Sequence, residues 1–269
     1  MLSILKFAIQ KKHNMQHIYE IIAGYFLPWY YWFFAFLGAF LLGFSKSGIK
    51  GIGVIIVLLM AFVFGGKNST GILIPLMILA DVFAVIYYHR HTQWVYLLKL
   101  LPSMVVGVLI GVWFGNDISE NLFKQIMAVF ILITVAIMVY MERKKNKSIP
   151  TNKLFSNGMG LLSGITSMIG NLAGAFASIY FLAMRLPKNE FIGTAAWLFF
   201  IINVFKLPFH IFVWKTVTTE TVLLNLLLAP SVIIGFFVGV QLVKLIHNHV
   251  YRKFILAVTA IGAITILLS

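Results

Sequence analysis

The same pattern of glycine, proline, lysine and asparagine occurs twice in this chain, within sequence that is almost entirely apolar. One group of matched residues recurs 121 positions further on, and a second group recurs 128 positions further on. The first group pairs Gly43, Gly53, Lys67 and Asn68 with Gly164, Gly174, Lys188 and Asn189, and the second pairs Pro102, Ser103, Gly107 and Gly111 with Pro230, Ser231, Gly235 and Gly239. A membrane protein built from two copies of one unit is typical of secondary transporters, whose substrate site lies between the copies. The repeat therefore favours a transporter over an enzyme or a receptor.

The composition requires a lipid environment. Hydrophobic residues make up 61% of the 269 residues and charged residues only 10%, whereas about 25% of residues are charged in a soluble protein. The formal net charge of +14 would suggest a nucleic-acid partner in a soluble protein. Here the basic residues lie mostly in short segments between apolar runs, as the positive-inside rule expects of a polytopic membrane protein. We therefore predict the lipid bilayer as a partner and no nucleic acid.

The apolar runs predict an all-α membrane protein with two homologous halves of about five hydrophobic segments each, giving 8–10 transmembrane helices. We divide the chain into an amphipathic or disordered lead-in (1–20), a first repeat (21–141), a hydrophilic linker (142–153) and a second repeat (154–269). An odd number of crossings per half would insert the second half upside down, so we expect an inverted repeat.

The second segment of each half is expected to be short. Residues 54–66 are too few to span a bilayer comfortably, since a crossing helix needs about 20 residues. In the second half, residues 154–184 form 31 uncharged positions that Gly164, Gly170 and Gly174 interrupt. The sequence predicts broken helices here and leaves open whether the short segments span or re-enter the membrane.

Both breaks are rich in small and polar residues, at 43–53 and at 164–174. A helix that breaks inside the membrane frees backbone N–H groups at its new N-terminus, and these groups together with the helix dipole favour an anion. Side-chain donors at the two breaks are Ser45, Ser47, Thr166, Ser167 and Asn171, and Gly48 lies among them. The alternative is that small residues there only allow close helix packing.

Three lysines lie in or beside apolar segments: Lys46 and Lys50 in the first break, and Lys206 just before Pro208. A lysine within a membrane is costly and usually faces water or an anion. The competing interpretation is that these lysines extend to the lipid headgroups at the interface.

Asp81 is the only acid inside an apolar run, and its repeat equivalent, after a slip of one residue, is Asn203. Acidic residues in such positions mark ion pathways or proton relays, so Asp81 is our candidate for proton coupling. The alternative is a static hydrogen bond or ion pair, for example with a lysine.

No metal site, cofactor or enzyme activity is predicted. His89 and His91, like His247 and His249, are two residues apart and therefore do not share a helix face. No carboxylate cluster lies near them in the sequence, and no catalytic or nucleotide-binding motif is present.

Residues 43–53 (GFSKSGIKGIG) and 193–210 (GTAAWLFFIINVFKLPFH) resemble the two signature stretches of the sulfite exporter TauE/SafE family, also called the toluene-sulfonate uptake permeases. Asn203, Lys206 and Pro208 fall at the family's spacing, whereas Ile49 and Lys50 stand where a small residue or a proline would be expected. The resemblance implies a multi-pass carrier of the bacterial inner membrane for sulfur-containing anions such as sulfite, thiosulfate or organosulfonates.

Together these features predict a secondary transporter that moves a small anion by alternating access, with proton coupling through Asp81 as an option. The predicted substrate site lies where the two breaks face each other near the bilayer midplane. Its residues are Ser45, Lys46, Ser47, Gly48, Thr166, Ser167, Asn171, Asn203 and Lys206. An anion channel and a non-transporting membrane assembly module remain as alternatives, and a homodimer is compatible with the sequence.

Overall fold

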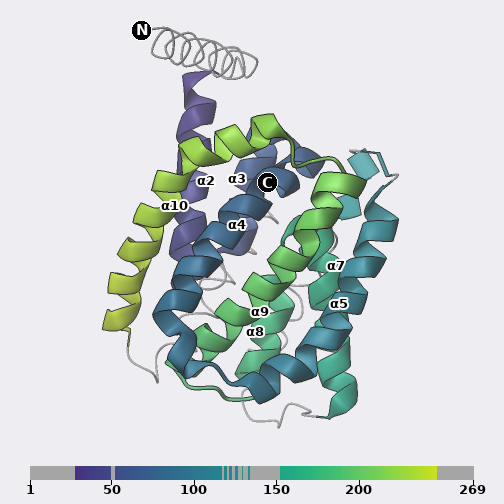
Figure 1. Cartoon of the computed structure of the whole chain (residues 1–269), viewed down its shortest axis with the longest axis vertical. Helices are drawn as coiled ribbons and strands as arrows, with labels where there is room; N and C mark the ends of the chain where they lie inside the picture. The colour runs from purple at the N-terminus through teal and green to yellow at the C-terminus, as the bar shows by residue number, and fades with distance from the viewer. Residues whose placement is uncertain are drawn as a thin grey trace, which may run out of the picture.

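The computed structural model describes residues 28–49, 52–116 and 152–246, together with single residues and pairs between 118 and 133. The described residues form helices joined by short turns, with no strand among them (Figure 1). The helices of the first half are α2 (Trp29–Lys46), α3 (Gly53–Phe64), α4 (Gly66–Tyr88) and α5 (Trp94–Asn116), with a 3-10 turn (His89–His91) after α4. Those of the second half are α7 (Lys153–Gly170), α8 (Ala173–Ala183), α9 (Lys188–Pro208) and α10 (Thr219–Leu245), with a π-helical turn (Phe209–Val213) after α9. The all-α prediction is confirmed.

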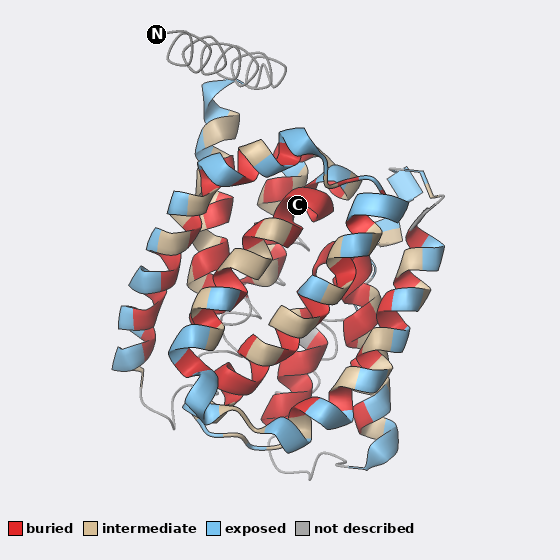
Figure 2. Ribbon diagram, in the orientation of Figure 1, coloured by how far each residue is buried: buried red, intermediate tan, exposed pale blue. Residues whose placement is uncertain are grey.

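Four of the described segments are long and apolar enough to cross a membrane: Gly66–His91, Trp94–Gly115, Lys188–Val213 and Thr219–Leu245. Large apolar side chains on their outer faces, such as Trp113 and Leu226, are exposed. In Figure 2 the exposed residues of α5 and α10 face outward and the buried ones face the other helices. This distribution suits lipid contact, because an exposed apolar side chain costs nothing where the solvent is itself apolar.

The second helix of each half is short, as the sequence predicts. Helix α3 has 12 residues and α8 has 11, so they are roughly 16–18 Å long and cannot cross an apolar layer of about 30 Å. Helix α2 ends at Lys46 before α3 begins at Gly53, and α7 ends at Gly170 before α8 begins at Ala173. Within the first break, residues 50 and 51 lie outside the described residues.

The repeated glycines bring helices of opposite halves into contact. A Cβ at Gly43 in α2 would overlap the carbonyl oxygen of Val232 in α10. A Cβ at Gly164 in α7 would likewise overlap the carbonyl oxygen of Met104 in α5. Gly164 follows Gly43 by 121 positions and Val232 follows Met104 by 128, so the contact recurs at the two shifts of the sequence repeat.

A second pair of contacts follows the same rule: Gly235 in α10 lies against Phe40 in α2, and Gly107 in α5 lies against Leu161 in α7. Helix α2 therefore packs on α10, and α7 packs on α5. In Figure 1 these two pairs flank α4 and α9, which lie between them. The halves interlock, because the first described helix of each half packs against the last described helix of the other.

Helices α4 and α9 pack against each other in opposite directions at the centre of the molecule. Gly71 near the start of α4 lies against Thr216, which follows α9, and Gly193 near the start of α9 lies against Tyr88 at the end of α4. Since the start of each helix lies at the end of the other, the two are antiparallel. Between these two ends, Asn203 of α9 contacts Asp81 of α4.

Some sequence predictions concern residues without a described structure. The lead-in (1–20), most of the linker (142–153) and residues 247–269, which include His247 and His249, lie outside the described residues. The domain boundaries predicted from the sequence therefore stay predictions.

Candidate functional site

A cavity of about 80 Å³ lies between the two helix breaks. A water molecule needs about 10–15 Å³ of such space, so the cavity could hold several waters or a small polyatomic ion. Its polar lining combines both halves of the chain: Ser45, Lys46, Ser167, Asn171, Ser178 and Asn203. The rest of the wall is apolar and includes Leu42, Met77 and Phe199. The cavity thus has a few polar groups set in an apolar surround, as is usual for small-molecule sites.

The first residues of both short helices border this cavity. Gly53 and Val54 open α3, Ala173 and Gly174 open α8, and all four are in the lining. A Cβ at either Gly53 or Gly174 would meet nothing within 4 Å, so these two repeat-equivalent glycines leave open space. Neither helix has a side-chain N-cap hydrogen bond. Because the first N–H groups of a helix have no partner within the helix, two sets of backbone donors are available at the cavity.

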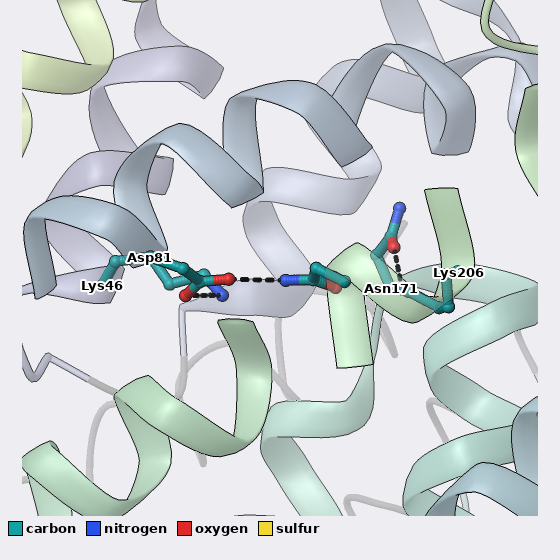
Figure 3. Close-up of polar contacts among 5 residues, drawn as sticks. Lys46, Asp81, Asn171 and Lys206 are labelled. Atoms are coloured by element: carbon teal, nitrogen blue, oxygen red, sulfur yellow. Dashed lines mark hydrogen bonds and ion pairs between the residues drawn. The ribbon is translucent and has the colours of Figure 1, made fainter. Parts of the chain in front are cut away.

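Lys46, Asp81 and Asn203 form a buried chain of polar contacts from three helices. Figure 3 shows the Lys46 and Asp81 side chains pointing toward each other. Lys46, the last residue of α2, places its Nζ 2.7 Å from Oδ1 of Asp81 in α4. Nδ2 of Asn203 in α9 donates to the other carboxylate oxygen, Oδ2, at 2.6 Å. Asp81 is fully buried and Lys46 is 6% exposed, so the ion pair has little water around it. The Lys46 ammonium also lies over the ring of Phe199, 4.8 Å from its centre.

A second buried lysine lies on the other side of the cavity wall. Nζ of Lys206 donates to the carbonyl oxygen of Ser167 and to Oδ1 of Asn171, both at 2.9 Å. Asn171 caps α7 in a left-handed conformation (φ 55°), and its Nδ2 donates to the carbonyl oxygen of Thr70 in α4 at 3.2 Å. Asn171 therefore ties together α4, α7 and α9. The carbonyl of Ser167 belongs to the last turn of α7, where the helix dipole stabilises a cation.

The two lysines near the cavity have different kinds of partner. Lys46 is paired with Asp81, whereas Lys206, which is fully buried, donates to a carbonyl and to an amide oxygen, both of which are neutral. Among the described residues, the hydrogen-bond and ion-pair partners of Lys206 include no carboxylate. Asp81 therefore holds Lys46, the lysine of the cavity wall, and leaves Lys206 to neutral acceptors.

The structure brings together most of the predicted site residues. Ser45, Lys46, Ser167, Asn171 and Asn203 line the cavity. Lys206 lies behind Ser167 and Asn171, and Asp81 contacts Lys46 and Asn203, without either being part of the cavity wall. Both Asp81 and Lys206 are fully buried, so Lys206 does not extend to the membrane surface.

Besides Lys206 and Asp81, three further predicted residues are not in the cavity wall. The Ser47 hydroxyl donates to the carbonyl of Phe44 at 2.8 Å, and the Thr166 hydroxyl donates to that of Leu162 at 2.7 Å. Hydroxyls near a helix end commonly bond the carbonyl three or four residues earlier, which turns them away from the cavity. Gly48 has a φ of 124°, and a Cβ there would overlap the side chain of Ile192.

Sequence reasoning missed Ser178 and Phe199, which both line the cavity. Ser178 follows Gly174 by four residues in α8, and Phe199 precedes Asn203 by four residues in α9. Residues four apart share a helix face, so extending the helical spacing from Gly174 and Asn203 would have identified both.

The comparison with protein-family models gives one match, to the family described as sulfite exporter TauE/SafE, over residues 35–266. The chain belongs to this family. Comparisons with curated proteins and with solved structures found no match. The TauE/SafE match covers most of the chain and includes every residue of the cavity wall, so the resemblance seen in the two signature stretches is confirmed.

As a TauE/SafE protein with membrane-spanning helices, the chain is a membrane protein of a transporter family. No group of three His, Asp or Glu side chains suited to a metal ion occurs in the described part of the chain. The arrangement of the TauE/SafE cavity offers hydrogen-bond donors and positive charge, which serve binding.

Proposed function

We propose that this TauE/SafE protein is a secondary transporter that carries a small sulfur-containing anion across the bacterial inner membrane by alternating access. Sulfite, thiosulfate and organosulfonates are the candidate substrates. The observation that carries the proposal is the cavity between the two breaks, with Lys46 in its wall and two uncapped helix N-termini beside it. Backbone N–H groups, hydroxyls and an ammonium can converge on the oxygens of a pyramidal or tetrahedral anion.

The proposed alternating access rests on an inverted relation between the halves. Equivalent helices α4 and α9 are antiparallel, and the glycine contacts of α2 with α10 match those of α7 with α5. In inverted-repeat transporters, two such halves can exchange conformations and thereby open the shared site to either side of the membrane. The membership in a transporter family gives no reason to assign an enzymatic activity.

Counterflow of labelled anion tests the proposed function. Purified protein in liposomes preloaded with unlabelled thiosulfate or sulfite should accumulate external labelled anion transiently, because a carrier exchanges substrate across the membrane. An anion channel would let the label equilibrate without accumulation. If no candidate anion shows any flux, the proposal is contradicted. The non-transporting membrane assembly module would then be the favoured alternative.

We further propose that Asp81 couples thiosulfate movement to a proton. Its carboxylate holds the Lys46 ammonium at 2.7 Å, so protonation of Asp81 would release Lys46 to the substrate. Asp81→Asn keeps the shape of the side chain and removes the charge. We expect this variant to lose the pH dependence of thiosulfate flux while expressing and folding as the unmodified protein does.

The measurement is the initial rate of thiosulfate uptake into liposomes at a series of external pH values. Thermal unfolding of the same preparations shows whether Asp81→Asn is folded. If Asp81→Asn is folded and its thiosulfate uptake keeps the original pH dependence, Asp81 serves only as the static ion-pair partner of Lys46.

A further inference from the structure

The charged groups beside the cavity can be counted. Lys46 and Lys206 contribute two positive charges and Asp81 one negative charge, and all three side chains are buried. The count takes Lys206 as an ammonium, the form that the negative end of α7 stabilises through the carbonyl of Ser167, to which Nζ donates at 2.9 Å. With this count, the site without substrate has a net charge of +1.

His210 follows Lys206 by four residues and is also fully buried. Its Nδ1 lies 2.9 Å from the hydroxyl of Thr216. We count His210 as neutral, because the Lys206 ammonium, one helical turn away, would repel a second cation at this position. His210 therefore does not change the count.

Other titratable groups on α4 and on the elements packed against it lie at helix ends or in the exposed turn after α4. Helix α3, which also packs on α4, contains no titratable residue. These outlying groups are Tyr30, Tyr31, Lys67, Tyr87, Tyr88, His89, Arg90, His91, Lys153, Lys188, Glu190, Glu220 and Lys244. Asp81 is thus the acid that the described helices bring to the cavity.

We propose that the site accepts a monoanion by itself, and a dianion only together with a proton on Asp81. The proposal rests on the proposed function, since it concerns the same cavity. Burying uncompensated charge is costly, so the occupied site is stable when the charges of protein and substrate cancel.

A monoanion cancels the net charge of +1 while the Lys46–Asp81 pair stays intact. The Lys46 ammonium has three N–H donors. Its ion pair with Asp81 engages at most one of them, so at least two remain for the anion. Asn203 keeps its hydrogen bond to Asp81 in this state.

A dianion leaves the site with a net charge of −1 unless Asp81 is protonated. Protonated Asp81 adds one positive charge to the count, and two lysines then balance two negative charges. The proton on Asp81 ends its ion pair with Lys46, whose three donors become available to the more highly charged substrate.

Sulfate and methanesulfonate make a matched pair of probes. Both present a tetrahedral sulfur with three or more oxygens, and a methyl group in methanesulfonate replaces one oxygen of sulfate. At neutral pH sulfate is a dianion and methanesulfonate a monoanion, so the two probes differ mainly in charge.

The experiment is calorimetric titration of the purified full-length protein with each probe, in buffers of different ionisation enthalpy, which gives the number of protons taken up per anion bound. We expect roughly one proton for sulfate and none for methanesulfonate. Linkage then requires the sulfate Kd to rise about tenfold per pH unit over the range in which one proton is taken up, while the methanesulfonate Kd stays constant.

Asp81→Asn should bind sulfate without proton uptake and should favour sulfate over methanesulfonate at alkaline pH. Equal proton uptake for both bound probes in the unmodified protein would overturn the inference and leave the proposed function standing. Proton uptake with sulfate that persists in Asp81→Asn would also overturn it. If neither these probes nor any candidate substrate binds, the proposed function fails.

Discussion

Replacement of Lys46 with alanine lowers the affinity for the transported anion by roughly ten- to a hundredfold. Lys46 is the charged residue in the cavity wall, so its loss removes one charge-assisted hydrogen bond of about 1.5–3 kcal/mol. Lys46→Arg should restore binding only in part, because a planar guanidinium does not replace a compact ammonium with three donors. The measurement is equilibrium binding of thiosulfate or sulfite to the purified variants.

The ion pair complicates Lys46→Ala, because the variant leaves Asp81 buried without its cation. Removing one partner of a buried pair costs about 3–5 kcal/mol of stability. The double variant Lys46→Ala/Asp81→Asn removes both charges and should recover much of that stability without recovering the lost hydrogen bond. Weak binding in a stable double variant would therefore assign the defect to the site.

Lys99→Ala is the matched control for charge. Lys99 is exposed on α5 and absent from the cavity wall, so its replacement removes the same positive charge at a distance from the site. We expect unchanged affinity. If Lys46→Ala is folded and binds as well as Lys99→Ala, the anion binds elsewhere.

The packing of the helices could be predicted from the sequence to a useful extent, because it depends on glycines. Gly43 and Gly164 recur at the repeat shift because each lies where a helix of the other half comes within backbone contact. Close backbone contact requires glycine at single positions, so it can be recognised in the sequence. The pairing of Asp81 with Asn203 as repeat equivalents follows from the same symmetry, and the two side chains form a hydrogen bond at 2.6 Å.

The direction of individual side chains at the breaks could not be predicted. Helical spacing gives directions only while the helix continues, and it is lost where α2 and α7 end. Ser45 is still within the last turn of α2 and lines the cavity, whereas Ser47 lies just beyond the helix end and bonds back to Phe44.

The sequence also could not identify which lysine forms the ion pair with Asp81. The sequence suggested a lysine, but Lys46 is 35 residues away from Asp81 along the chain and on another helix, and Lys206 was an equal candidate. The choice depends on how α2, α4 and α9 cross, and no local pattern encodes that crossing. The structure pairs Asp81 with Lys46 and gives Lys206 neutral acceptors.

The four glycines that define the first part of the repeat should divide into two pairs with opposite effects. At Gly43 and Gly164 a Cβ would overlap a backbone carbonyl oxygen of the facing helix, which cannot move without displacing that helix. Overpacking of this kind costs about 1–3 kcal/mol or more, so Gly43→Ala and Gly164→Ala should unfold at lower temperature and yield little protein.

At Gly53 and Gly174 a Cβ meets nothing within 4 Å, and alanine favours a helix over glycine by up to about 1 kcal/mol. Gly53→Ala and Gly174→Ala should therefore be at least as stable as the unmodified protein. Their methyl groups would enter a cavity of about 80 Å³ next to the backbone donors of α3 and α8, so anion binding and transport should weaken. Thermal unfolding and labelled-anion flux, measured on all four variants, separate the two roles. Equal loss of stability in the two pairs would mean that the glycines at the cavity serve packing alone, and the anion site would then have to lie away from the starts of α3 and α8.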